Sequence, residues 1–159
     1  MLETDVARFI QGRVMSLIAT RNQAHRPMIG RGTGARFDPD SGEISVLVSR
    51  SQWPEAVAWA RPGLPISTTH VKPDDYQAYQ IKGIITGVRP ATAAESAQGS
   101  RYVAEMLETL GGLGVTRLQL SSTLSDHELV RVSFLPCDLF VQTPGPAAGR
   151  RLTDGFPAP

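Results

Sequence analysis

The sequence has little cysteine, few charges and no long apolar segment, and each shortage excludes a class of protein. It contains a single cysteine, Cys137, so no internal disulfide can form and a reducing compartment is expected. No stretch is long and apolar enough to span a membrane, and the N-terminus lacks the pattern of a signal peptide. The sequence therefore predicts a cytoplasmic protein without a membrane partner.

The chain also has almost no excess of charge of either sign. Charged residues make up 19% of the chain and the formal net charge is +1, which gives no bulk attraction to nucleic acid. Only Lys72 and Lys82 are lysines; the other fourteen basic residues are arginines, whose planar forks suit phosphate groups. The arginines are scattered and no aromatic residues are interleaved with them, so a nucleic-acid partner is not predicted. A length of 159 residues with 41% apolar content predicts one globular domain.

The usual signatures of metal centres, hydrolases and nicotinamide-binding domains are missing. The three histidines and Cys137 are not spaced as metal ligands, so no metal site is predicted. No serine stands in a G-x-S-x-G setting. Residues 30–35 match the loose dinucleotide pattern G-x-G-x-x-A, but a turn follows them where the pattern needs a helix. A nicotinamide-binding site is therefore not predicted.

What the chain does contain is a succession of short strands bounded by turns. Apolar alternation and β-branched runs predict strands over 14–21, 28–37, 43–48, 64–71, 78–88 and 129–142, with Pro136 as an interruption in the last. A further short strand is expected over 117–121. Helices are predicted over 4–10, over 54–60, and over 93–110 after a capping box from Thr92 to Glu95. Helices inserted among successive strands indicate a mainly β protein of the α+β class, a barrel or sandwich with accessory helices.

Two further features bear on domain organisation and on the sheet. Residues 144–159 are too rich in proline and glycine for regular structure, so we expect a domain over 1–143 and an extended tail over 144–159. In the second strand Gly30, Gly32 and Gly34 fall on one face. Glycines so placed predict that something flat or bulky lies against that face, or that the sheet curls tightly into a barrel.

The segment from Glu43 to Ala60 is the first candidate binding site. Its strand runs into a helix through the polar residues Ser49-Arg50-Ser51-Gln52, and Pro54 suits the first turn of the helix. Such a junction favours an anion, because the first helical N–H groups lack partners within the helix. An ordinary turn with Ser51 as the helix cap explains the same residues and is the simpler interpretation of this stretch alone.

The strand over 78–88 is the second candidate. Gln80 and Lys82 share one of its faces, and Ile81 and Ile85 share the other. A glutamine supplies both the donor and the acceptor that the imide edge of a flat heterocycle requires. A lysine in the middle of a strand needs an acceptor or solvent, so an exposed strand face explains this pair equally well.

Taken together, three segments resemble one protein family. They are Leu17–Asp38 (LIATRNQAHRPMIGRGTGARFD), the strand that ends in a basic and hydroxyl turn before a helix, and Tyr79–Val88 (YQIKGIITGV). They resemble the FMN-binding split-barrel family related to pyridoxamine-phosphate oxidase, and residues 138–149 (DLFVQTPGPAAG) are similar to a segment common in its bacterial members. The resemblance covers about residues 5 to 149 and implies a six-stranded antiparallel split β-barrel that forms a homodimer and binds FMN between its subunits.

The resemblance also implies which residues hold the cofactor. Arg26 and Arg31 have the spacing of the family's basic pair, and Arg31 is expected to contact the flavin ring or phosphate. The phosphate-binding turn of the family corresponds to residues 50–52, although its adjacent basic pair is absent here. Gln80 corresponds to the glutamine at the flavin ring edge. The predicted cofactor-binding residues are thus Arg26, Arg31, Arg50, Ser51, Gln52, Gln80 and Lys82, and no catalytic acid or base is predicted.

One departure from the family narrows the expected function. The vitamin B6 oxidases end with a tryptophan followed by an Arg-Leu motif, whereas Arg151-Leu152 has no such tryptophan partner here. We therefore expect an FMN-dependent oxidoreductase that acts on an unidentified small molecule other than pyridoxamine phosphate. Two alternatives remain open: a split barrel that binds haem or a deazaflavin, with His25 and His70 as candidate axial ligands, and a non-catalytic flavin-binding or dimerisation module.

Overall fold

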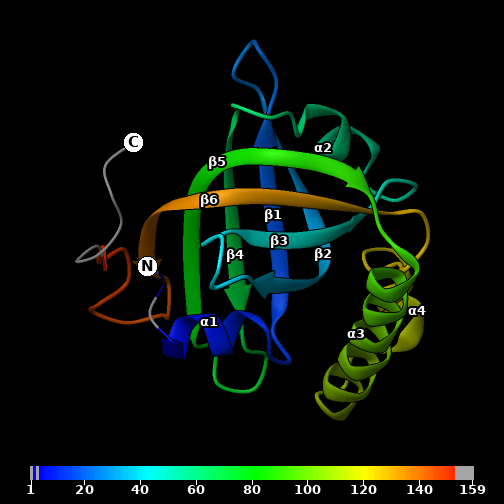
Figure 1. Ribbon diagram of the computed structural model, residues 1–159. Helices are drawn as coiled ribbons and strands as arrows, with labels where there is room; N and C mark the ends of the chain where they lie inside the picture. Colours follow the sequence, from blue (N-terminus) through cyan, green and yellow to red (C-terminus); the bar gives the residue numbers. More distant parts are fainter. Residues whose placement is uncertain (1, 3, 153–159) are drawn as a thin grey trace.

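The computed structural model describes Leu2 and residues 4–152, and six strands of this part form a closed antiparallel barrel (Figure 1). Each strand pairs with two neighbours, and β4 closes the barrel on β1. The order around the barrel is β1 (Met15–Arg21), β2 (Pro27–Phe37), β3 (Ile44–Ser49), β6 (Leu129–Val141), β5 (Ala78–Pro90) and β4 (Pro65–Val71). The predicted six-stranded antiparallel barrel is confirmed.

The alternation of side chains decides which face of each strand is inside. In β1 and β4 every second residue is buried, as a strand with one face on a core requires. Burying one large aliphatic side chain contributes about 1.5–3 kcal/mol, so a slip of one residue is strongly disfavoured. The barrel interior is filled mainly by Ile18, Val46, Ile66, Ile81, Ile85, Val132 and Phe134.

Helices cover the ends and one side of the barrel. The short helices are α1 (Thr4–Ile10) and α2 (Pro54–Trp59), and the long one is α3 (Ala93–Gly112), which lies beside the barrel (Figure 1). The predicted capping box starts α3, because Thr92 Oγ1 accepts from the Glu95 N–H at 3.2 Å and Glu95 Oε2 accepts from the Thr92 N–H at 2.8 Å. No helix within the described residues has the length and apolar character needed to cross a membrane.

The strand expected over 117–121 is wrong, because this segment is the helix α4 (Arg117–Ser121). A second capping box starts it. Thr116 Oγ1 accepts from the Gln119 N–H at 3.3 Å, and the Thr116 N–H donates to Gln119 Oε1 at 2.8 Å. The pattern T-x-x-Q was present in the sequence and favours a helix start over a strand.

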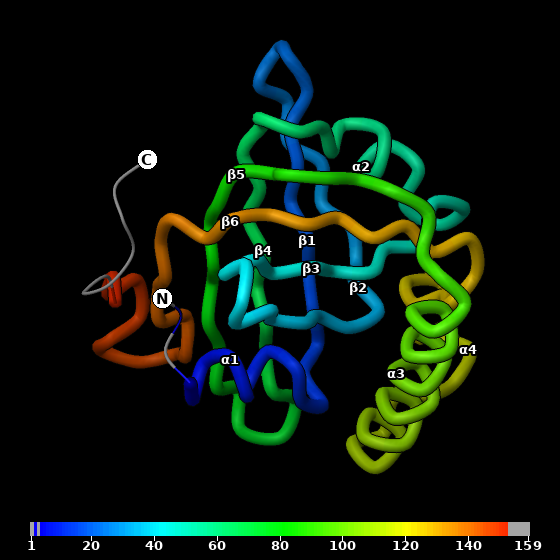
Figure 2. The backbone as a smooth tube through the Cα atoms, viewed as in Figure 1, coloured from blue at the N-terminus to red at the C-terminus, as the bar shows by residue number. Residues whose placement is uncertain are grey.

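The last strand and the tail follow the sequence more closely. β6 continues through Pro136, but its pairing with β5 shifts between Lys82 and Gly83, where the proline has no N–H to donate. The chain then turns back along β6, so that the Leu152 N–H donates to the Leu139 oxygen at 2.7 Å. The returning segment lies on the other side of the barrel from α3 (Figure 2). The division at residue 143 stays a prediction, and residues 153–159 of the expected tail lie outside the described residues.

Candidate functional site

Strand register places three of the predicted residues on one outer surface, which we call the β1–β4 face. Two rows of outward-facing residues cross strands β2, β1, β4 and β5 there. The first row is Arg31, Leu17, Thr69 and Gln80; the second is Ile29, Ala19, Ser67 and Lys82. Neighbouring strands lie about 4.8 Å apart, so three strand steps separate Arg31 from Gln80 by about 14 Å. This face is therefore wide enough for a flat ring to lie between them.

Arg31 is a buried cation for which the described residues supply no counterion. Only 9% of the residue's surface is exposed, and Nη1 donates to Thr123 Oγ1 at 3.0 Å. The Nε and Nη2 atoms are cut off from solvent and have no partner within the described residues. Burial lowers the pKa of the Arg31 guanidinium, which records the cost of keeping the charge out of water. Since an unpaired buried charge costs several kcal/mol, this arrangement is suited to an anion or another strong acceptor.

A hollow of about 450 Å³ lies on the second row, within the size range of small-molecule sites. Ser67 and Lys82 line it, and the Ser67 hydroxyl is buried without a partner in the described part of the chain. The Lys82 ammonium lies 4.8 Å from the centre of the Phe140 ring. In the first row, the half-buried Gln80 accepts a long hydrogen bond of 3.5 Å from the Gln142 amide. Gln80 and Lys82 thus present polar atoms to a largely open surface.

The junction between β3 and α2 differs from both of its sequence interpretations. The helix has six residues, its N-cap is Trp53, and no side chain caps it. Ser51 is therefore not the cap; its hydroxyl lies 3.1 Å from that of Ser49. The N–H groups of Gln52 and Trp53, just before the helix, donate to Ser49 Oγ at 3.3 Å and to the Ser49 backbone oxygen at 2.9 Å. These two backbone donors are therefore not free to hold an anion.

The site predicted for the phosphate, the turn at residues 50–52, is partly filled by the chain itself. We call this site the phosphate corner. Gln52 Nε2 donates to the Ser121 oxygen at 3.0 Å, while Arg31 donates to Thr123, so the two side chains hold the last residue of α4 and the segment just after it. Gln52 Oε1 and Trp53 Nε1 are buried without partners among the described residues. Nothing in the local sequence marks Thr123 as a member of this corner, because only the fold brings it there, whereas Trp53 directly follows Gln52 in the chain.

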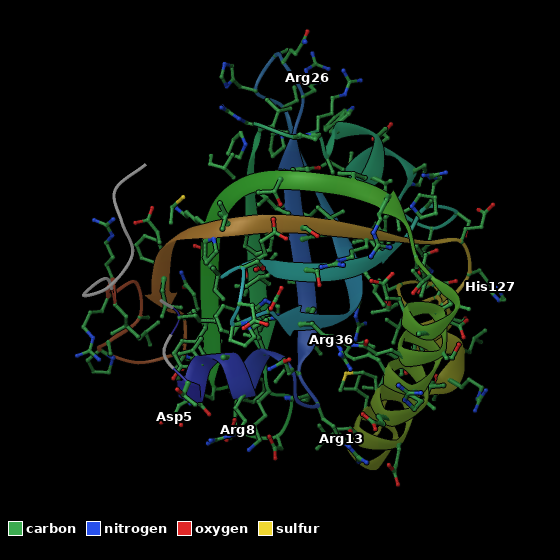
Figure 3. All side chains as sticks on the ribbon, in the orientation of Figure 1. Asp5, Arg8, Arg13, Arg26, Arg36 and His127 are labelled. Atoms are coloured by element: carbon green, nitrogen blue, oxygen red, sulfur yellow. The ribbon has the colours of Figure 1, made fainter. Side chains whose placement is uncertain are left out.

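Two of the predicted arginines are exposed. Arg26 is exposed on the loop between β1 and β2, at the tip of the molecule in Figure 3. Arg50 is exposed as well, and its backbone N–H donates to the Glu128 oxygen at 3.0 Å. Arg31 is thus the one member of the predicted basic pair that the fold buries.

The glycine stripe of β2 is explained by the barrel and not by a ligand. A Cβ at Gly32 would lie 2.6 Å from Val46 Cγ1, and one at Gly30 would lie 3.2 Å from Trp53 Cβ. Both positions face inward, so tight curling of the sheet and the close approach of α2 account for them. Gly34 lies within the bulge between Gly32 and Ala35, with φ of +107°, and faces Tyr102, so the expectation of three glycines on one face is wrong.

His70 lies inside the barrel and is fully buried. Its Nδ1 is hydrogen-bonded to Ser16 Oγ at 3.0 Å and its Nε2 to Thr68 Oγ1 at 3.1 Å. Both ring nitrogens are therefore engaged, and the expectation that His70 could ligate a haem is wrong. Burial lowers the pKa of His70 from 6.5 to about 4, so the ring stays neutral in the folded protein near pH 7.

This histidine predicts a loss of stability in mild acid. The unfolded chain takes up a proton at His70 as pH falls below about 6.5, whereas the folded protein does so only near pH 4. The stabilising contribution of the neutral ring is complete above pH 6.5, and about 3 kcal/mol of it is lost as pH falls to 4. Urea unfolding at several pH values should show this slope in wild type and in the exposed control His127→Gln. A His70→Gln variant that keeps the full slope would contradict the assignment.

Comparisons with known proteins support the geometry at the level of the fold. Neither protein-family models nor curated proteins match the sequence. Solved structures do match it, among them HupZ of Group A Streptococcus, with a TM-score of 0.52 and 15% identity over 94% of this chain and 100% of that one. An F420 reductase matches with a TM-score of 0.51 and 10% identity, over 83% of this chain and 93% of that one. A putative pyridoxamine 5'-phosphate oxidase from Lactobacillus delbrueckii matches with a TM-score of 0.50 and 11% identity, over 87% and 93%.

This chain is a split barrel. The strand order, the closure of β4 on β1 and the alignment along most of each chain agree with the fold that the resemblance implied. Identities of 10% to 15% establish the architecture alone. What the split barrel binds must therefore be argued from its own residues.

Proposed function

We propose that this split barrel is a homodimeric flavoprotein that binds FMN on the β1–β4 face and acts as an oxidoreductase on a small molecule. The observation that carries the proposal is Arg31, a nine-tenths buried guanidinium with two N–H groups that lack acceptors among the described residues. A phosphate or a ring carbonyl of FMN would supply the missing acceptor through charge-assisted hydrogen bonds.

The other predicted residues suit the remaining parts of the cofactor. Gln80, three strands across from Arg31, offers an amide donor and acceptor to the imide edge of a ring. The unpartnered Ser67 hydroxyl and the Lys82 ammonium stand in the next row. A bound flavin would supply the redox chemistry, while these side chains would hold it, orient its ring and exclude water from one side.

A second copy of the chain would cover the other side of the ring. Ile29 is 61% exposed on the β1–β4 face, and Ile84 is 38% exposed beside the hollow. Apolar side chains left in water on an open sheet face are typical of an interaction surface. A two-fold dimer uses the same surface on both subunits, so it would bury both copies of this face together.

The experiment that tests this function is a titration of the purified protein with FMN, followed by visible absorbance and by flavin fluorescence. We expect stoichiometric binding with a perturbed flavin spectrum, and a dimer mass in solution. Arg50 is exposed, so a bond from it to the FMN phosphate would be made at the solvent-facing edge, and Arg50→Ala should weaken FMN binding about tenfold and leave the dimer intact. Arg8→Ala, on α1, is the matched control. Absence of any spectral change with wild-type protein would refute FMN binding.

A deazaflavin is the second candidate, because an F420 reductase has the same fold at a TM-score of 0.51. Parallel titrations with FMN, F420 and hemin separate the cofactors, and tighter binding of F420 than of FMN would favour this alternative. For haem, His25 remains as the predicted ligand outside the barrel, and it is exposed at the β1–β2 loop. A Soret band that is lost in His25→Ala would favour haem. A bound flavin that no nicotinamide donor reduces would instead support a non-catalytic module.

A further inference from the structure

A second polar hollow, of about 470 Å³, lies between the barrel and the first half of α3, away from the β1–β4 face. It is formed by the outer surface of β2, β3 and β6, where Arg36 pairs with Ser45 across the sheet and Arg131 lies one row further along β6. Figure 3 shows Arg36 between the barrel and α3. The polar groups that line this hollow belong to Arg36, Arg101, Arg131, Ser45, Gln98, Glu95 and Asp38.

Positive charge exceeds negative charge around this hollow. Glu95 is already neutralised by Arg89, which donates to its two carboxylate oxygens at 2.8 Å each. This contact lowers the pKa of Glu95 to about 2, so its charge is constant at neutral pH. The other acid on the rim is Asp38, whose carboxylate accepts from Ser41 Oγ at 2.7 Å. Three guanidinium groups line the hollow with two carboxylates, and one of these carboxylates is already paired with a fourth guanidinium, that of Arg89.

Three of the guanidiniums keep hydrogen-bonding capacity for a ligand. Arg131 reaches Glu95 Oε1 with Nη1 at 3.4 Å, while its Nε is buried and unpartnered in the described part of the chain. Arg36 and Arg101 are exposed, and neither has a carboxylate partner within the described residues. Like charges gathered around one hollow repel each other, so a bound anion would reduce this repulsion. It would also offer an acceptor to the unpartnered Arg131 donor.

We infer that this hollow, which we call the α3 anion site, binds the phosphate group of a small phosphorylated molecule. The three arginines come from β2, α3 and β6 and reach the hollow from different directions. A carboxylate has two oxygens and fits one arginine fork, whereas a phosphate has enough oxygens to accept from several arginines at once. The Ser45 hydroxyl and the Gln98 amide add neutral donors for the same oxygens.

This site is independent of the proposed flavin site. Arg31 donates to Thr123 on the β1–β4 side, while Arg36 lies beyond the bulge of β2, and the two hollows share no lining residue. Failure of one proposal therefore leaves the other standing. The two can be separated by variants that each remove arginines from one site only.

Calorimetric titration with pyrophosphate at low ionic strength is the test. Wild-type protein should bind it, and the double variant Arg36→Gln/Arg101→Gln should bind about 100-fold more weakly, about tenfold for each lost contact. Both side chains are exposed, so the variant should fold normally, which circular dichroism and its melting temperature will check. The control Arg61→Gln/Arg117→Gln makes the same change in net charge at exposed positions away from the hollow and should bind like wild type.

Each other outcome overturns the inference. Absence of pyrophosphate binding to the wild type refutes the site. Equal weakening in the control pair shows a bulk charge effect. Loss of binding in Arg31→Met, with retention in Arg36→Gln/Arg101→Gln, places the anion at the flavin site. Citrate that binds more tightly than pyrophosphate refutes the phosphate class.

Discussion

Replacing Arg31 with methionine is expected to weaken FMN binding about 1,000-fold, or about 4 kcal/mol. The guanidinium is nine-tenths buried, its Nε and Nη2 donors are unpartnered in the described residues, and a ligand oxygen that met them would do so in a dry environment. Removing such a partner leaves the ligand charge desolvated without compensation. Titration of the variant with FMN, followed by fluorescence, measures the loss.

The same substitution separates a ligand-holding role from a structural one. If Arg31 is kept for a ligand, the unliganded Arg31→Met protein should be at least as stable as wild type, because an apolar side chain replaces a desolvated cation. If the hydrogen bond from Arg31 to Thr123 were needed for stability, the variant would unfold at a lower denaturant concentration than wild type. Arg61→Met, an exposed arginine between α2 and β4, is the control and should alter neither property. Unchanged FMN affinity in Arg31→Met would refute the site.

The elements of this fold could be predicted because their signals are local. The alternation in β1 and β4, the capping box at Thr92 and the interruption at Pro136 each lie within a few residues, and each has its expected counterpart in the structure. The alternation also placed Gln80 and Lys82 on the outer face of β5, opposite the core residues Ile81 and Ile85. The strand expected over 117–121 was wrong, because the equally local T-x-x-Q pattern at Thr116 starts a helix there.

The candidate site could not be predicted in the same way, because it depends on register between distant strands. Arg31 and Gln80 are related through three separate strand pairings: Arg31 is paired with Leu17, Leu17 with Thr69, and Thr69 with Gln80. No local pattern fixes those offsets. The burial of Arg31 depends in turn on residue 123, which the fold brings to it from the far end of α4. The corner was expected to use helix N–H groups, but α2 begins only at Pro54, and the Gln52 and Trp53 N–H groups before it are bonded to Ser49. Its residue assignments stay predictions.

The largest loss of stability from a single methyl group is expected for Gly83→Ala. Gly83 faces the interior at the point where the pairing of β5 with β6 shifts register. An added Cβ would lie 2.2 Å from the Leu135 backbone oxygen and 2.7 Å from Phe134 Cδ2. A backbone oxygen in a paired strand cannot move aside as a flexible side chain can, so the strands must separate locally. Overpacking of this kind should cost about 4 kcal/mol and lower the melting temperature by roughly 10 °C.

Gly87 supplies a matched control on the same strand, since a Cβ there would meet no heavy atom within 4 Å. Gly87→Ala should therefore change the free energy of unfolding by less than about 1 kcal/mol, with a gain possible from the lower entropy of the unfolded chain. Guanidinium unfolding of both variants measures the difference. Gly83 also lies next to Lys82 at the hollow of the β1–β4 face, so separation of β5 from β6 should disturb that hollow as well. Equal stability of the two variants would show that β6 does not approach β5 as closely as this barrel requires.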